Sequence, residues 1–362
     1  MATLSLCMIV RNEGPTLDRA ISSFSGLADE VVIVDTGSTD DTVAVAESFG
    51  AKVLHHEWQD SFSVARNLGF DACTGDWVFA LDADEYLLPE SRDELKRLVE
   101  TGTSTGYVIT RRDITPGGTS EMFFVRLGRR SAGRRLVGRI HEHFEPPLDR
   151  IEKSGILIEH TGYSPGRKEP RLRRNVRLLE MELADRPGQS YYLADLTHTY
   201  WLLRDPRWKE ALVQTLASLD LSLPKSPVPV VPALLEMVFS APESELPAGV
   251  THAAAETIAE RWYPTAVPLL VSRCRLAFGR GDLPAAADLG ERAIKAWESG
   301  RYDRTISFNP ISVGPEMRLN LGIALAHSGR IEEAIHRFEE AEQDPRFTEA
   351  AKANIAALRA LD

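Results

Sequence analysis

The stretch that decides the fold is Phe79-Ala80-Leu81-Asp82-Ala83-Asp84-Glu85, an apolar run that ends in two carboxylates one residue apart. In an extended segment residues i and i+2 share a face, so Asp82 and Asp84 can converge on one small cation. Mg²⁺ and Mn²⁺ prefer carboxylate oxygens, and Mg²⁺ commonly joins one or two carboxylates to the phosphates of a substrate. The pattern indicates a metal clamp for a phosphate-bearing substrate. Acidic pairs after strands also serve as helix caps and turn residues without a metal.

Alternating strand and helix signals surround this stretch in the first third of the chain. Apolar and β-branched runs predict strands at 4–10, 30–35, 52–56 and 77–81, and helical spacing predicts helices at 15–24, 40–49 and 62–73. This order predicts a doubly wound α/β domain with a mostly parallel sheet covered by helices. The two carboxylates then lie at the carboxyl edge of the sheet, where such folds bind ligands.

Other acidic residues follow the second predicted strand. Asp35 closes a buried strand at the carboxyl edge, where a carboxylate is unexpected unless it meets a ligand or a donor. Asp40 and Asp41 precede a helical run, and capping of that helix accounts for at least one of them. Asp35 is therefore a second candidate for ligand binding.

Composition limits the possible functions. With 362 residues the chain exceeds the usual size of one hydrophobic core, so two domains are expected. The net charge of −11 argues against a general binder of nucleic acid or anionic membranes. Three cysteines at spacings that fit neither a disulfide framework nor a zinc knuckle indicate a reducing compartment. The apolar run at 4–10 is too short for a membrane span and lacks the flank of a signal peptide, so we expect a cytoplasmic protein without a membrane span.

The middle of the chain is irregular and basic. Strand-like runs at 107–110 and 123–126 flank the turn Pro116-Gly117-Gly118, and arginines crowd between residues 111 and 139. In so acidic a chain this cluster can meet a diphosphate or an acidic acceptor, or it can be a solvated face paired with carboxylates. Ser164-Pro165-Gly166 precedes a basic run with helical spacing, so we expect one domain at 1–165 and a helical domain at 166–362.

The second half is dominated by helical signals, interrupted by a proline-rich loop at 224–232. Small and large residues recur in the register of tetratricopeptide repeats, best at 267–300 and 315–348, with a poorer copy at 192–219. An irregular helical bundle with alanine-rich faces is the alternative. Helical stacks more often bind peptides or subunits than carry chemistry, so this domain bears on acceptor choice or on a homodimer.

Two familiar phosphate-binding motifs are absent after the first strand. Val10-Arg11-Asn12-Glu13-Gly14 is neither the glycine-rich motif of dinucleotide-binding folds nor a P-loop. A haloacid-type phosphatase would carry Asp-x-Asp near its first strand, whereas here the pair lies deep in the domain.

Four ordered motifs carry a more specific signal: Met8-Ile9-Val10-Arg11-Asn12-Glu13, Val32-Ile33-Val34-Asp35-Thr36-Gly37-Ser38-Thr39-Asp40-Asp41-Thr42, Ala65-Arg66-Asn67 and Gly75-Asp76-Trp77-Val78-Phe79-Ala80-Leu81-Asp82-Ala83-Asp84-Glu85. Together they resemble the successive motifs of family 2 glycosyltransferases with the GT-A fold. The resemblance continues more weakly through Gly138-Arg139-Ile140-His141-Glu142 and Ile158-Glu159-His160-Thr161-Gly162-Tyr163. With the helical repeats, these later motifs are similar to the subgroup that includes glycosyltransferases of bacteriocin peptides and is related to some lipopolysaccharide-core transferases.

The resemblance implies an inverting hexosyl transfer from a nucleotide sugar, usually a UDP-sugar, to a peptide, protein or glycan acceptor, with Mn²⁺ or Mg²⁺. The roles that it implies follow residue by residue. Val10, Arg11 and Glu13 would border the nucleobase, Asp35 would accept its imide N–H, Arg66 would close over the nucleotide, Asp82 with Ala83 would lie near the ribose or the metal, and Asp84 would bind the metal. His160 would complete the metal shell, or it would be a hydrogen-bonded strand histidine.

An inverting transfer also needs a base that takes the proton of the acceptor. Many relatives use the acidic residue of a Glu-Asp pair, and none follows residue 100. Glu142 is our candidate for the base and His141 its rival. A thiol acceptor would require less of the base than a hydroxyl, because a thiolate is intrinsically nucleophilic.

Two other classes of function share some of these features. In the first, the α/β domain is a non-catalytic nucleotide-binding scaffold whose repeats bind partners, and the intact Asp35, Asp82 and Asp84 count against it. The second is a sugar-phosphate nucleotidylyltransferase, which needs a glycine-rich basic loop after the first strand that residues 11–15 do not supply.

Overall fold

The computed structural model describes residues 1–115, 118–133, 135–160, 168–302 and 313–360. The chain divides into two compact units, Met1–Pro187 and Gly188–Asp362. The domain change expected at 165/166, the Ser164-Pro165-Gly166 stretch and part of the motif at 158–163 fall within residues 161–167, outside the described residues, as do Pro116 and Gly117 of the expected turn. Helix α5 (Lys168–Asp185) is grouped with the first unit.

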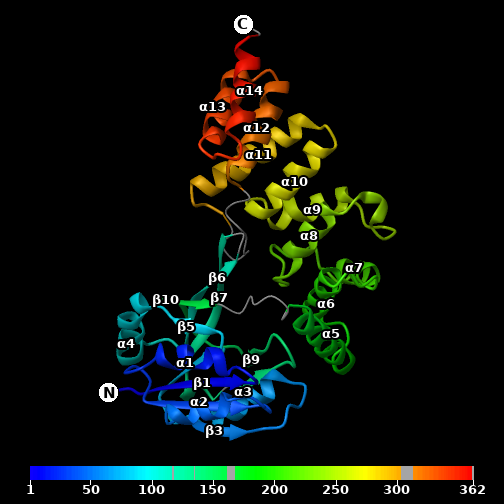
Figure 1. Cartoon of the computed structure of the whole chain (residues 1–362). Helices are drawn as coiled ribbons and strands as arrows, with labels where there is room; N and C mark the ends of the chain where they lie inside the picture. Colours follow the sequence, from blue (N-terminus) through cyan, green and yellow to red (C-terminus); the bar gives the residue numbers. More distant parts are fainter. Residues whose placement is uncertain (116–117, 134, 161–167, 303–312, 361–362) are drawn as a thin grey trace. The chain divides into compact units, whose positions relative to one another are not determined.

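The first unit begins with the predicted alternation of strands and helices (Figure 1). Its opening elements are β1 (Leu4–Val10), α1 (Gly14–Ser22), β2 (Glu30–Asp35), α2 (Thr42–Ser48), β3 (Lys52–His55), α3 (Phe62–Ala72) and β4 (Trp77–Leu81). The elements that follow are β5 (Glu85–Leu87), η1 (Pro89–Ser91), α4 (Arg92–Thr101), β6 (Gly106–Thr115), β7 (Gly118–Arg129), η2 (Arg130–Ala132), β8 (Arg135–Val137), β9 (His143–Glu145) and β10 (Ile151–His160). The sequence patterns indicated only β6 and β7 among these later elements, and with shorter bounds.

The main sheet is mixed and has the order β3-β2-β1-β4-β7-β6-β10-β5. Strands β3, β2, β1 and β4 are parallel, as the α/β pattern predicts. Strand β7 enters antiparallel to both β4 and β6, β6 and β10 run parallel, and β5 pairs antiparallel with β10 at the edge. The carboxyl ends of β1, β2 and β4 therefore meet at one edge. The last residue of β10, His160, pairs with Glu85, the first residue of β5, which follows β4 after the short turn at residues 82–84.

Alternating side chains along β1 separate two cores in this unit. Leu4, Leu6 and Met8 are fully buried with apolar residues of α1 and α4, whereas Cys7 packs on the other face with Cys73 at the end of α3. Period-2 alternation places successive side chains on opposite faces, so the sheet has helices on both faces. The predicted α/β domain is confirmed.

The second unit is helical. Its elements are α6 (Ser190–Leu202), α7 (Trp208–Ala217), α8 (Val231–Ser240), η3 (Glu243–Glu245), α9 (His252–Trp262), α10 (Val267–Gly279), α11 (Leu283–Glu298), α12 (Pro315–His327), α13 (Ile331–Glu342) and α14 (Thr348–Arg359). The pairs α10–α11 and α12–α13 occupy the ranges expected for the best repeats, and α6–α7 occupies the range of the poorer one.

Glycines allow close packing and tight turns in these pairs. Gly281 and Gly329 both have a φ of +75° in the turns, a conformation that costs glycine little. A Cβ on Gly322 would lie 2.6 Å from the ring of Phe338, so α12 and α13 approach closely only because residue 322 has no side chain. Among the described residues, no helix combines the length and the apolar character that a membrane crossing requires.

Candidate active site

The Asp82-Ala83-Asp84 stretch is a turn and not an extended segment. Strand β4 ends at Leu81, and the Glu85 N–H donates to the Asp82 carbonyl oxygen at 3.0 Å. Asp82 N–H in turn donates to the Glu85 carboxylate at 3.1 Å. Because the chain reverses here to begin β5, the i and i+2 geometry of an extended strand does not apply to the two aspartates, and the contacts described for their side chains differ. Ala83 between them is buried.

Asp82 lies between two arginines from different elements. Arg66 of α3 donates to its Oδ1 at 2.7 Å, and Arg126 of β7 donates to its Oδ2 at 2.7 Å. Both guanidinium groups are largely buried. Each carboxylate oxygen of Asp82 thus accepts a charge-assisted hydrogen bond, the strongest class of such bonds in proteins.

Arg126 reaches this position through an irregularity in β7. The pairing of β6 with β7 passes from Tyr107–Leu127 to Val108–Val125, so Arg126 is an extra residue in a β-bulge. Bulges disrupt the ladder locally and re-aim a side chain, often next to functional sites.

Glu85 extends the network away from Asp82. Its carboxylate is fully buried and accepts from Arg126 at 3.0 Å and from Arg111 of β6 at 3.3 Å. Arg111 also pairs with Asp113, two residues further on the same face of β6, at 2.9 Å.

His160 closes the network at the end of β10. Its Nδ1 lies 3.0 Å from Oδ1 of Asp113, and its Nε2 lies 3.1 Å from Oδ2 of Asp84. The strand register places His160 opposite both Asp113 of β6 and Glu85 of β5. The ring is therefore held between two carboxylates.

At the opposite end, the Nε of Arg66 pairs with the carboxylate of Glu142. The whole set, which we call the ion-pair chain, runs Glu142, Arg66, Asp82, Arg126, Glu85, Arg111, Asp113, His160, Asp84, with acidic and basic groups in alternation. Alternation compensates the cost of placing so many charged groups in a largely buried region.

The ion-pair chain shifts the protonation equilibria of its members. Burial opposes ionisation of Asp82, but the charges of Arg126 and Arg66 outweigh it and hold the pKa of Asp82 well below its usual range. Burial dominates at Glu85 and raises its pKa despite Arg126. At His160, burial is outweighed by hydrogen bonds to Asp113 and Asp84, which raise the pKa to about 9.

The residues expected at the nucleobase lie at the ends of β1 and β2. Asp35 is buried and accepts from the N–H groups of Gly37 and Ser38, at 3.3 Å and 3.1 Å. Asn12 joins the two loops, because its N–H donates to Ser38 Oγ at 2.9 Å and its side-chain oxygen accepts from Thr39 N–H at 2.7 Å. The loops after β1 and β2 therefore form one wall, which also carries Val10, Arg11 and Glu13.

Capping of α2 falls to Asp40, as expected for at least one of the two aspartates. Its Oδ1 accepts from Thr42 N–H at 3.0 Å, whereas Asp41 occupies the N-cap position without a side-chain capping bond.

His141 and Glu142, the two candidates for the base, lie in the loop between β8 and β9. His141 is exposed and has a φ of +53°, a left-handed conformation that is uncommon for residues other than glycine. Glu142 is turned inward to Arg66, and its side chain is 14% exposed. Of the two, only Glu142 belongs to the ion-pair chain.

The Asp84 end of the ion-pair chain offers part of a binding site for a divalent cation. Among the described residues, no group of three or more histidine, cysteine or acidic side chains is arranged to hold a metal ion. Asp84 and His160 nevertheless offer one oxygen and one nitrogen donor side by side. Mg²⁺ and related ions often take only one or two protein ligands and complete their shell with substrate phosphates and water.

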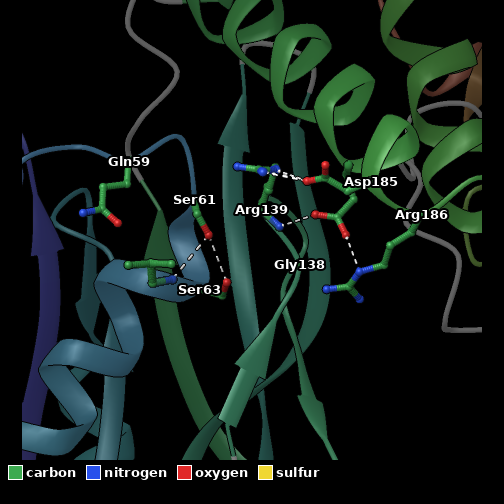
Figure 2. A pocket seen from close by; sticks show the side chains of 9 residues that line it. Gln59, Ser61, Ser63, Gly138, Arg139, Asp185 and Arg186 are labelled. Carbon is green, nitrogen blue, oxygen red and sulfur yellow. Dashed lines mark hydrogen bonds and ion pairs between the residues drawn. The ribbon is translucent and has the colours of Figure 1, made fainter.

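Beside the Glu142 loop lies a polar pocket of about 290 Å³ (Figure 2). Its lining groups are mutually paired: Glu182 of α5 accepts from Arg139 N–H at 2.7 Å, and the Arg139 guanidinium bonds to Asp185 at 2.6 Å. These contacts hold α5 on the loop that carries His141 and Glu142. None of the predicted site residues lines the pocket.

Comparison with known proteins finds relatives for the first part of the chain. Residues 5–171 match the model of the family described as Glycosyl transferase family 2. A TPR repeat-containing protein of Synechococcus elongatus is 35% identical over 208 residues, which cover 54% of this chain and 52% of that protein. The SPbeta prophage-derived glycosyltransferase SunS of Bacillus subtilis is 24% identical over 214 residues, 53% of this chain and 47% of that protein.

Among solved structures, S. aureus TarS 1-349 in complex with UDP-GlcNAc has a TM-score of 0.41 at 12% identity, with 83% of this chain and 93% of that chain covered. The chain spans about half the length of the two relatives named above. Residues 5–171 form a glycosyl transferase family 2 domain, which confirms the predicted family for this part of the chain.

Four members of the ion-pair chain were not identified as site residues from the sequence: Glu85, Arg111, Asp113 and Arg126. Arg111 was visible only as a member of the arginine cluster, and Asp113 lies beyond the strand predicted at 107–110. The two residues share a face because β6 continues to Thr115. Arg126 was visible only as one member of the arginine cluster, since nothing in the sequence marks a bulge. The alternative expectation for that cluster, a solvated face paired with carboxylates, agrees with the pairing of Arg111 and Arg126 but not with their exposure, because both side chains are largely buried.

Proposed function

We propose that this protein is an inverting glycosyltransferase that transfers a hexose from a nucleotide sugar, with a UDP leaving group, to a peptide, protein or glycan acceptor. The observation that carries this proposal is the ion-pair chain, which ends in Asp84 and His160 at the carboxyl edge of the sheet of a glycosyl transferase family 2 domain. A site built to hold a diphosphate and its sugar needs charged groups fixed in advance, and buried arginine–carboxylate pairs provide such fixed groups.

On the nucleotide side, we assign the base-binding wall to the joined loops after β1 and β2. Asp35 would accept the imide N–H of uracil, and Val10, Arg11 and Glu13 would border the ring. Arg66, which lies on α3, is assigned to the nucleotide side as well. Its ion pairs with Asp82 and Glu142 hold its guanidinium group next to the edge of the sheet. Both oxygens of Asp82 already accept from arginines, so we assign Asp82, with Ala83, to the ribose side and not to the metal.

We assign Asp84 and His160 as the protein ligands of one Mn²⁺ or Mg²⁺ ion. When bound, such an ion stabilises the negative charge that develops on a departing diphosphate. The contribution of the protein is to hold one carboxylate and one imidazole in register at the end of β10 and the turn after β4.

Glu142 is our proposed base, with His141 as the rival. In the transfer, the acceptor oxygen or sulfur forms a bond to the anomeric carbon, the bond from that carbon to the diphosphate oxygen breaks, and its electron pair leaves with UDP. The proton of the acceptor passes to the carboxylate of Glu142. Its contact with Arg66 ties the position of this carboxylate to the nucleotide side.

The test measures UDP release from a panel of UDP-sugars, with Mn²⁺ and with chelator. We expect Asp84→Ala to lower release by about two orders of magnitude, because it removes a charged ligand from the site where the leaving group develops charge. Asp71→Asn is the matched control, since Asp71 is an exposed aspartate that pairs with Arg135 away from the ion-pair chain. Its activity should equal that of the parent protein.

Full turnover by Asp84→Ala in chelator would contradict the proposed mechanism. Thermal stabilisation by UDP without any turnover of any UDP-sugar would favour the non-catalytic scaffold instead. Thermal shift with nucleotides and nucleotide sugars, with and without Mn²⁺, is the companion measurement, because a ligand that binds only the folded state raises its stability.

A further inference from the structure

Asp113 has a position that the proposed chemistry does not by itself require. Asp113 lies on β6, far in sequence from the turn after β4 that carries Asp84. Its side chain is 1% exposed. Among the residues that the structure describes, nitrogen atoms of two side chains contact its carboxylate: Nδ1 of His160 at 3.0 Å, and Nε and Nη2 of Arg111 at 2.9 Å and 3.1 Å.

These contacts fix the orientation of the His160 ring. Because Nδ1 faces Asp113, Nε2 faces the opposite way, to Asp84 at 3.1 Å. The alignment is set by the sheet, since β6 and β10 run parallel with Asp113 directly opposite His160. When a carboxylate accepts a hydrogen bond from one nitrogen of a neutral imidazole, the lone pair of the other nitrogen is left to bind a metal ion.

We propose that Asp113 is a positioning residue: it holds the Nδ1–H of His160 and thereby presents Nε2, beside Asp84, to a divalent cation. This inference rests on the metal site of the proposed function. Arg111 has a supporting part, because it neutralises Asp113 and is itself held in place by Glu85. Carboxylates that orient a metal-binding histidine typically change metal affinity by 10–100-fold when they are removed.

The experiment measures Mn²⁺ affinity in the presence of saturating UDP, by the electron paramagnetic resonance signal of free Mn²⁺, and the nitrogen hyperfine coupling of the bound ion. We expect Asp113→Ala to weaken Mn²⁺ binding by about 10–100-fold and to reduce the nitrogen coupling. Asp113→Asn, which keeps the shape of the side chain, should have a smaller effect in the same direction.

The matched control is Glu121→Gln. Glu121 lies on the same β6–β7 hairpin and pairs with an arginine, Arg112, but it is exposed and outside the ion-pair chain. It should leave Mn²⁺ affinity unchanged. UDP affinity without metal should be the same in all variants, which separates metal binding from a general loss of structure.

A double-mutant cycle distinguishes positioning from a purely structural effect. If Asp113 acts through His160, then Asp113→Asn should add no further loss of Mn²⁺ affinity in a His160→Ala background. Independent, additive losses would overturn the inference, as would a folded Asp113→Ala protein with the affinity and nitrogen coupling of the parent.

The same data separate this inference from the proposed function. A parent protein that binds Mn²⁺ with UDP through His160, but is indifferent to Asp113, overturns the inference alone. A parent protein that binds no Mn²⁺ in the presence of UDP overturns the inference together with the proposed metal site.

Discussion

At the scale of single residues, the behaviour of each charged group depends on whether burial or a partner dominates. Asp82 and Glu85 are three residues apart and share Arg126, yet their pKa values move in opposite directions. Asp82 has one arginine for each oxygen, whereas Glu85 is fully buried and competes for the same guanidinium. Breaking a buried pair by removing one partner costs about 3–5 kcal/mol, so substitutions of Arg126 affect folding as well as the site.

Glu236, on α8 of the helical unit, makes stability depend on pH. Burial, only partly offset by Arg275, raises its pKa to about 7. Because the folded state holds this proton more tightly than the unfolded chain, the stabilisation is complete below the unfolded pKa and is lost as pH rises through 7. We expect Glu236→Gln to raise the free energy of unfolding at pH 8 by roughly 1–3 kcal/mol, and by well under half as much at pH 5.

Urea unfolding at the two pH values measures this difference. Glu349→Gln provides the control, since Glu349 is an exposed glutamate of α14, and its effect should be small and the same at both pH values. An equal change at pH 5 and pH 8 for the Glu236 variant would show that Glu236 is ionised in the folded protein throughout this range.

At the scale of elements, the strands and helices up to β4 could be predicted because each one is local. Apolar runs such as Leu4–Val10 and Glu30–Asp35 report burial directly, and their bounds agree with β1 and β2. The turn at residues 82–84 could not be predicted, because the edge strand β5, which begins at Glu85, pairs with the distant β10. The position of Arg126 depends in the same way on a bulge that only the pairing of β6 with β7 reveals.

The residues of the candidate site also divide into those that local sequence predicts and those that depend on long-range strand pairing. Asp35, Arg66 and Asp84 stand in local motifs at strand or helix ends and could be named from the sequence. The pairing of His160 with Asp113 joins residues 47 positions apart, so only the assembled sheet reveals it.

The α12–α13 helix pair depends on the absence of a side chain at residue 322. Gly322→Ala would place a Cβ 2.6 Å from the buried Phe338 ring, which cannot move without disturbing its own packing. We expect a loss of about 1–3 kcal/mol, despite the better helix propensity of alanine. Gly279→Ala is the matched control: a Cβ there meets nothing within 4 Å at the end of α10, so that variant should be neutral or slightly more stable. Thermal unfolding of both variants measures the contrast, and equal melting temperatures would contradict close packing at Gly322.

At the scale of the whole molecule, each unit has a hydrophobic core of its own. One core joins β1, β2 and β4 to α1 and α4, and a separate one joins α10 through α14. Units with independent cores are expected to unfold as separate cooperative transitions, so calorimetry should resolve two. The ligands of the proposed function would bind only the first unit, Met1–Pro187.

UDP with Mn²⁺ should therefore raise one transition and leave the other in place. At free ligand concentrations near 100 times Kd, the expected stabilisation is about 2.7 kcal/mol. Two variants assign the transitions: Asp84→Ala should reduce the ligand-induced shift to the shift that UDP causes without metal, and Gly322→Ala should lower only the transition that UDP does not move. Gly322 lies in the helical unit and Asp84 in the first, so the two effects should be independent. A single transition that moves as a whole with UDP and falls as a whole in Gly322→Ala would instead mean that the two units fold as one cooperative body, and the helical repeats would then contribute directly to the stability of the nucleotide site.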